Sequence, residues 1–195
     1  MKVIINGQDS SVRGDGLPKI ADVVELIKAS IDPEHMITGI LINGKELQEQ
    51  DWTATTTEFG TAIIEVETGT PESFVTERMG LASNVVRECY LRFRDSRKEF
   101  QDGKMQQGNH KLIEAVHTAQ AFFEWYGALM ALVPQERKSA FDITPQVYEI
   151  SAICKRICQQ QLYQSWWALG ETLEKELEPK LDSLEDFCRG FALQA

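Results

Sequence analysis

The strongest constraint on this fold is that residues 1–69 carry the pattern of a complete sheet-and-helix unit, after which the chain continues as helix. A first strand is expected over residues 1–7, because Val3 and Ile5 share one face of an extended chain. The dipeptide Asn6-Gly7 tolerates positive φ angles, so it favours a tight hairpin turn into a return strand. The pattern predicts a separate domain over residues 1–69.

The rest of this unit is predicted to contain one helix and three further strands. After Gly14-Asp15-Gly16-Leu17-Pro18 breaks the first pattern, residues 20–31 place apolar side chains at helical spacing, so a helix is expected to cover the sheet. Asn43-Gly44 is the strongest hairpin signal in the chain, and it links the apolar run 36–42 to a short return strand. A last half-buried strand is predicted where apolar residues alternate over 62–67.

The first third of the chain carries a recognisable set of sequence features: an opening strand followed by Asn6-Gly7, then Ile42-Asn43-Gly44, Trp52 and Phe59-Gly60. It resembles the ubiquitin-like sulfur-carrier proteins of thiamin and molybdopterin synthesis, which implies a β-grasp fold. Carriers of that family are activated at a free C-terminal Gly-Gly. Here the matching residues are Glu67-Thr68-Gly69-Thr70-Pro71 and the chain continues, so a carrier role needs cleavage after Gly69. A β-grasp domain reused as a docking surface is the favoured interpretation.

Residues 70–195 are predicted to form an antiparallel four-helix bundle. Thr70-Pro71 is a helix start, because a threonine hydroxyl caps free amides and proline suits the first turn. The first helix is expected to run to about Phe100 and to end at Asp102-Gly103-Lys104. A second helix is expected to begin around Gly108 and to close at Pro134, with a core stripe of Leu112, Val116, Ala119, Phe123, Tyr126, Met130 and Val133.

Thr144-Pro145 repeats the start signature and opens a third predicted helix. Its end is left open between Gly170 and Glu178, and an interruption or kink is expected at Pro179. Apolar residues at helical spacing predict the rest of the bundle core: Ala82, Val86, Cys89, Phe93, Ser96 and Phe100 in the first helix; Val147, Ile150, Cys154, Ile157 and Leu162 in the third; and Leu169, Leu173, Leu177, Leu181, Leu184, Cys188 and Phe191 in the last stripe.

Three stretches of the helical part carry a second sequence resemblance: Cys89-Tyr90-Leu91-Arg92-Phe93, Phe100-Gln101-Asp102-Gly103 and Ala119-Gln120. Together they are similar to the helical flagellin-binding secretion chaperones. Those proteins are small cytoplasmic bundles that mask a partner helix in a groove. The resemblance therefore implies a protein partner.

Charge is uneven along the chain and restricts the class of partner. The formal net charge is −10, and residues 1–70 hold 12 acidic against 5 basic side chains. An acidic surface repels phosphate backbones, so nucleic acid is not expected as a partner, whereas a basic protein surface is favoured.

Location is predicted from hydropathy and cysteine usage. The most apolar window, residues 119–133, contains Glu124 and is shorter than the ~20 residues that a membrane-spanning helix needs. The first seven residues become polar too early for a secretory signal. The four cysteines lie in helical patterns and not in the loops of a disulfide scaffold, so we expect a cytoplasmic protein that does not bind membranes.

Two small groups of side chains are candidates for metal chemistry. Glu114 and His117 form a Glu-x-x-His pair, and His110 shares their helical face. A di-iron bundle uses that motif twice, and the second copy is missing, so a solvated polar face is favoured. Cys154 and Cys158 are adjacent on one helix, but a closed zinc site needs four ligands. Buried thiols acting as small hydrophobes are the favoured interpretation.

Two further clusters point to binding. A basic group on one helix could meet an acidic partner or, as we favour, pair with the acidic N-terminal unit: Arg87, Arg92, Arg94, Arg97 and Lys98. The large aromatic residues outnumber the positions of one stripe, so some are expected at the surface, where aromatics dominate binding hot spots, although most are expected to fill the core. They are Phe122, Phe123, Trp125, Tyr126, Tyr163, Trp166 and Trp167.

No phosphate-binding loop, dinucleotide turn, nucleophile elbow or zinc-protease motif occurs in the sequence. We therefore assign no catalytic, cofactor-binding or metal-binding residue and predict a non-catalytic protein-interaction protein, acting as an adaptor, a chaperone-like binder or an assembly subunit. Self-association stays open. The alternatives are a metal- or small-ligand-binding bundle and a sulfur-carrier-like protein.

Overall fold

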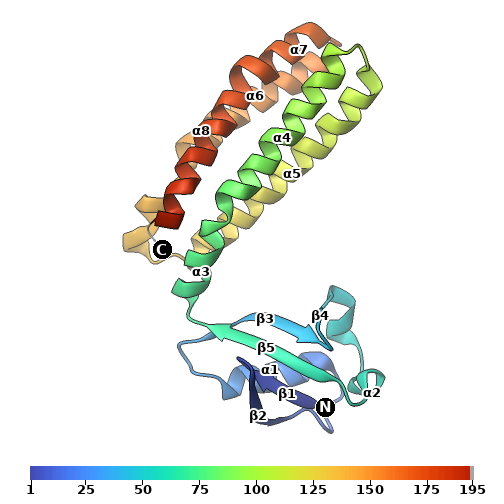
Figure 1. The fold of residues 1–195 in the computed structure, drawn as a ribbon, viewed down its shortest axis with the longest axis vertical. Coiled ribbons are helices and arrows are strands. Elements are labelled where there is room, and N and C mark those ends of the chain that lie inside the picture. Colours follow the sequence, from blue (N-terminus) through green and yellow to red (C-terminus); the bar gives the residue numbers. More distant parts are fainter. Residues whose placement is uncertain (194–195) are drawn as a thin grey trace. The chain divides into compact units, whose positions relative to one another are not determined.

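The computed structural model describes residues 1–193, and the chain divides into two compact units, Met1–Phe74 and Val75–Ala195 (Figure 1). The first unit is a five-stranded mixed sheet with one long helix, and the second is largely helical, with about four long helices among the described residues. The chain is therefore an α+β protein.

The N-terminal sheet has the strand order β2-β1-β5-β3-β4. The central strand β5 runs parallel to its neighbour β1, with Val3 opposite Ile64, and the remaining neighbours are antiparallel. This arrangement is consistent with a β-grasp-like domain. The elements of this unit are β1 (Lys2–Ile5), β2 (Gln8–Arg13), α1 (Ile20–Ser30), β3 (Met36–Ile42), β4 (Lys45–Glu46), the 3₁₀ turn η1 (Glu49–Thr53), α2 (Thr56–Phe59) and β5 (Ile63–Gly69).

Both predicted hairpin turns are confirmed. Asn6 and Gly7 have φ angles of 49° and 76°, and Asn43 and Gly44 have 50° and 74°. Positive φ at both central residues matches the right-handed twist of the flanking strands, which is why Asn-Gly is favoured there. Local turn chemistry thus sets the strand register of this unit.

Helix α1 covers one face of the sheet with the predicted apolar stripe. Its inward side chains are fully buried, and β5 meets them with every second residue. The alternation places Glu65 and Glu67 outside. The core of this unit consists of Val3, Val12, Ile20, Val23, Val24, Ile27, Ile42, Ala62, Ile64 and Val66.

The second unit is built from helices in chain order. Thr70 Oγ1 accepts a hydrogen bond from the Ser73 amide at 3.2 Å, so the predicted cap at the first helix is present. The elements are α3 (Pro71–Gly80), α4 (Ala82–Gln101), α5 (Met105–Leu132), η2 (Gln135–Phe141), α6 (Thr144–Leu162), α7 (Trp166–Thr172), the π-helical η3 (Leu173–Leu177), α8 (Glu178–Arg189) and η4 (Gly190–Leu193).

Two boundaries in the first half of this unit differ from prediction. The helix expected from Pro71 to Phe100 is divided at Leu81, whose amide bonds the Arg78 carbonyl in a tighter, 3₁₀-type turn. Helix α5 starts at Met105 and not around Gly108. Gly108 is not a boundary residue; it lies inside the helix against the ring of Phe100.

The third helix ends earlier than either predicted position. Helix α6 stops at Leu162, and Gln164 then adopts a φ of 53° that turns the chain into α7. From there α7, η3 and α8 follow one another directly. The interruption expected at Pro179 is found just before it, where the Glu178 amide bonds the Leu173 carbonyl five residues back. A π-type turn of this kind is a known cause of an interruption or kink within a helix.

Helix α5 buries a different side from the one predicted. The heptad Leu112, Ala119, Tyr126 and Val133 is buried as expected, but the positions between are shifted by one residue. Ala115, Phe122 and Leu129 are buried, whereas Val116, Phe123 and Met130 are only half-buried. The reason is that α5 packs closely against α4, while its other side faces the space next to α6.

Candidate functional site

The space between α5 and α6 is an apolar groove. We define the α5–α6 groove as a cavity of about 220 Å³ lined by Phe93, Leu112, Ile113, Val116, His117, Gln120, Cys154, Ile157, Cys158 and Gln161. Its floor is the buried core residues Phe93, Leu112 and Ile157.

Helix packing explains why this groove exists. Helix α5 packs along α4, whereas α6 packs against α7 and α8, so α5 and α6 each have a closer neighbour than one another. One polar contact joins them, from Gln161 Nε2 to Asn109 Oδ1 at 3.1 Å. The predicted core residue Val116 and the half-exposed Ile113 therefore form a wall that the remaining helices leave uncovered.

Three side chains singled out from the sequence for metal chemistry meet at this groove. His117 lines it from α5, and Cys154 and Cys158 line it from α6. Glu114 instead contacts His110, whose Nε2 is 3.4 Å from Glu114 Oε1 at the exposed surface. Within residues 1–193, no three His, Cys, Asp or Glu side chains are grouped closely enough to hold a metal ion.

The thiols differ in burial, and Cys158 is exposed while Cys154 is half-buried. Burial raises the pKa of the Cys154 thiol to about 11, with a smaller contribution from Cys158. Burial likewise raises the pKa of Cys89 to about 11 and that of Cys188 to about 12. The predicted burial therefore holds for Cys89 and Cys188, but Cys158 is open to solvent.

We expect one fast-reacting thiol per chain in the native state. At pH 8 a thiol with a pKa of 11 or more is almost entirely protonated, and only the thiolate attacks a disulfide reagent. Titration with 5,5′-dithiobis(2-nitrobenzoic acid) should modify Cys158 first, and the Cys158→Ser variant should lose this phase. In denaturant all four thiols should react. A native burst of two or more equivalents would contradict the burial seen here.

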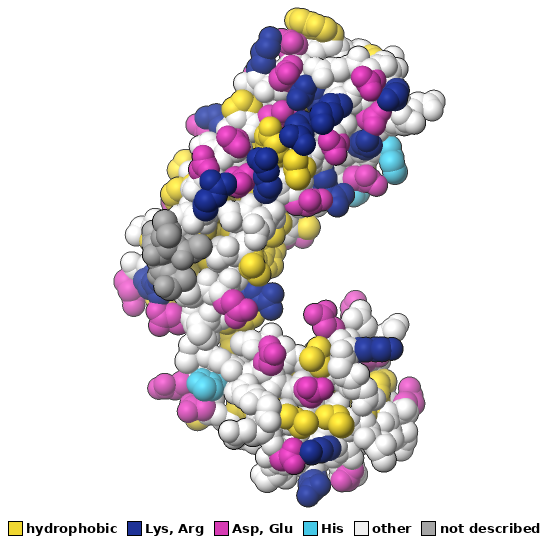
Figure 2. All heavy atoms as spheres, viewed as in Figure 1, with side chains coloured by type: hydrophobic (Ala, Val, Ile, Leu, Met, Phe, Trp, Pro, Cys, Tyr) yellow, Lys and Arg dark blue, Asp and Glu magenta, His cyan; other side chains and the backbone are white. Residues whose placement is uncertain are grey.

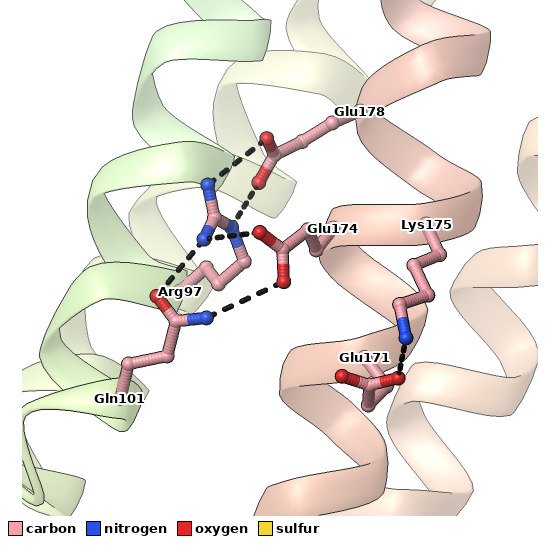
Figure 3. Close-up of polar contacts among 6 residues, drawn as sticks. All are labelled: Arg97, Gln101, Glu171, Glu174, Lys175 and Glu178. Atoms are coloured by element: carbon pink, nitrogen blue, oxygen red, sulfur yellow. Dashed lines mark hydrogen bonds and ion pairs between the residues drawn. The ribbon is translucent and has the colours of Figure 1, made fainter.

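Several residues of the basic cluster pair with acidic side chains of the helical unit itself. Arg97 reaches from α4 to Glu178, with Nε and Oε1 2.5 Å apart, and to Glu174 at 3.2 Å (Figure 3). Gln101 accepts a hydrogen bond from Arg97 and donates one to Glu174. The pKa of Arg97 is raised, first of all by its hydrogen bond to Glu178.

Three of the other four basic residues of this cluster also have acidic partners within the helical unit. Arg87 lies 3.3 Å from Glu185 on α8, Arg92 pairs with Glu88, and Lys98 pairs with Asp95. Arg94 lies over the Tyr90 ring at 5.7 Å. Figure 2 shows lysine and arginine side chains interspersed with acidic ones over the helical unit. The surface is therefore mixed in sign and offers no uniformly basic face in this view.

The aromatic residues separate into core and surface groups. Phe122 and Tyr126 are buried, and the Tyr126 hydroxyl donates to the Phe141 carbonyl at 2.5 Å. Phe123 and Trp125 are half-buried. Tyr163 and Trp167 are exposed, as is Leu162, which was predicted to be in the core and is 82% exposed because α6 ends there.

Gly69 is the last residue of β5 and pairs with Met36 on β3. The chain passes directly from it through Thr70 into α3. Among residues 1–193 no helix has the length and apolar character required to cross a bilayer.

No protein-family model, curated protein or solved structure matches this chain. The two sequence resemblances therefore stay predictions.

Proposed function

We propose that this chain is a non-catalytic, cytoplasmic protein-interaction protein whose helical unit binds a helix of a partner in the α5–α6 groove. In this proposal the helical unit is an antiparallel four-helix bundle and residues 1–69 are a β-grasp domain that serves as a second docking surface. The four free cysteines support a reducing compartment.

The observation that carries the proposal is the chemistry of the groove. Its floor is apolar, one wall is formed by Ile113 and Val116, and polar side chains lie at its edges. Grooves of this kind receive the apolar face of an amphipathic helix, which inserts anchors at positions i, i+3 or i+4, and i+7. His117, Gln120 and Gln161 supply hydrogen-bonding groups for the polar rim of such a complex.

The length of the groove limits the segment that it can hold. The lining residues of α5 extend from Leu112 to Gln120, which corresponds to about 12 Å along the helix axis. That is a little over two helical turns, enough for two or three anchor side chains.

The acidic N-terminal unit adds a preference for a partner with basic residues, since this unit holds 12 acidic and only 5 basic side chains.

The proposal is tested by affinity purification with matched variants. Val116→Asp places a charge in the groove wall, and Tyr148→Asp places the same charge at a position of α6 that is 74% exposed. We expect a stoichiometric partner to be recovered with the wild-type chain and with Tyr148→Asp, and to be lost with Val116→Asp. Both variants are first checked for an unchanged thermal melt.

Two results would contradict the proposal. The first is repeated recovery of no partner by the wild-type chain. The second is a partner retained by the folded Val116→Asp variant, because a charge in the wall would oppose any apolar anchor. No observation among the described residues favours the metal-binding or carrier alternatives; elemental analysis and intact mass, respectively, test them.

A further inference from the structure

The turn between α6 and α7 exposes an unusual run of large apolar side chains. Leu162, Tyr163 and Trp167 are 82%, 83% and 79% exposed. Single exposed hydrophobic residues are normal on protein surfaces, but a contiguous group marks an interaction site. We call these three residues together with Trp166 the distal patch. The tip of the helical unit, near α7, shows hydrophobic side chains in Figure 2.

The distal patch is held in one conformation by its own backbone. The Tyr163 amide bonds the Gln159 carbonyl at 3.0 Å, and the Ser165 amide bonds the Gln160 carbonyl at 2.8 Å. Trp166 stacks on Phe100 with 5.6 Å between the ring centroids. A preorganised turn loses little entropy when its side chains are covered, so the patch is suited to binding.

A hollow lies directly beside these protruding side chains. Its volume is about 320 Å³, and it is lined mainly by Phe100, Met105, Trp166, Trp167 and Gly170. Trp167 therefore belongs both to the protrusion and to the wall of the recess. A surface that carries a protrusion next to a recess can complement its own copy across a two-fold axis.

Charge around the patch favours a second copy over a strongly charged partner. Glu99 pairs with Lys104 and Lys111, and Glu171 pairs with Lys175. Asp102 also contacts Lys104. Three acidic and three basic side chains thus compensate one another, and two identical patches meet without net repulsion despite the chain's net charge of −10.

We propose that the distal patch is the interface of a homodimer, in which Tyr163 and Trp167 of each copy pack into the hollow of the other. This self-association is distinct from partner binding in the α5–α6 groove. The groove lining ends at Gln161, next to the patch residue Leu162, but the groove and the hollow beside the patch have no lining residue in common.

Analytical ultracentrifugation of the full chain over a concentration series, up to about 100 µM, tests the proposal. The wild-type chain is expected to sediment as a dimer at the upper end. Trp167→Glu should weaken dimerisation about 30-fold or more, as for the loss of an aromatic hot spot. Tyr148→Glu is the matched control at an exposed position of α6 outside the patch and should leave the dimer intact.

Trp167→Glu is not expected to unfold the chain, because Trp167 is exposed. Circular dichroism verifies that the variant is folded. Hydrogen exchange provides a second measurement: residues 162–171 should gain protection as the concentration rises. A wild-type chain that stays monomeric throughout would overturn the proposal and would assign the patch to another protein. A dimer that survives Trp167→Glu would also overturn it. The groove variant Val116→Asp should stay dimeric, which separates this proposal from the proposed function.

Discussion

Replacing Arg97 by alanine is expected to lower the free energy of unfolding by about 3 kcal/mol or more. The Arg97 and Glu178 side chains are only 12% and 8% exposed, and two hydrogen bonds join them, from Nε to Oε1 and from Nη2 to Oε2. Removing the guanidinium leaves a carboxylate without its main counter-charge at the buried α4–α8 contact. The loss then includes the desolvation of Glu178 as well as the pair itself.

A double variant separates these two contributions. Arg97→Met together with Glu178→Leu removes both charges and should cost less than Arg97→Ala alone, because apolar groups of similar size often replace a buried pair at little cost. Urea denaturation at pH 7 measures both free energies. A loss below about 1 kcal/mol for Arg97→Ala would show that the pair behaves as an exposed one and would contradict the burial described here.

Replacing Gly108 by alanine is expected to destabilise the helical unit by about 2 kcal/mol, although alanine is the better helix former. A Cβ atom at Gly108 would lie 2.8–2.9 Å from three atoms of the Phe100 ring. Phe100 is buried and stacked on Trp166, so a displacement of its ring would disturb this stacking. The Gly108 carbonyl also accepts a buried hydrogen bond from Ser96 at 2.9 Å, which a shift of α5 would break.

Gly127 provides the matched control for this prediction. It lies in the same helix, is exposed, and has no atom within 4 Å of the position a Cβ would occupy. Gly127→Ala should therefore stabilise the protein by about 0.5–1 kcal/mol through helix propensity alone. Thermal or urea unfolding of the two variants is expected to give opposite signs. Equal stabilisation by both would contradict the close α4–α5 packing.

The N-terminal unit was predictable because its signals are local. Asn6-Gly7 and Asn43-Gly44 require the turn that they form, and the stripe of α1 can be buried only on one side. The predicted bounds of α1 therefore agree with the structure to within a residue. The helix start at Thr70-Pro71 was predictable for the same reason, since capping depends on neighbouring residues.

The helical unit was less predictable because which of its side chains are buried depends on helices that are distant in the sequence. Both sides of the α5 heptad are apolar, so the sequence does not tell whether Ala115 and Phe122 or Val116 and Phe123 face the core. The closer approach of α4 decides this. Leu162 has the spacing of a core residue, but α6 ends at it, and Gln164 carries no strong signal for its positive φ angle.

The candidate site shows the same limit. His117, Cys154 and Cys158 were each noticed for possible chemistry, yet their meeting place depends on the spacing of α5 and α6. The basic cluster was recognised, but its partners on η3 and α8 are more than 75 residues away in the chain. Such pairings follow from the fold and not from any short motif.

The rate at which Cys158 reacts with a thiol reagent, measured with and without the recovered partner, tests the central claim most directly. Cys158 is exposed and lines the α5–α6 groove. If a partner helix lies in this groove, native Cys158 should react at least tenfold more slowly in the complex than in the free chain. The free chain used for this comparison should show the unchanged wild-type thermal melt. An unchanged rate in a saturated complex would place the partner elsewhere and contradict the account.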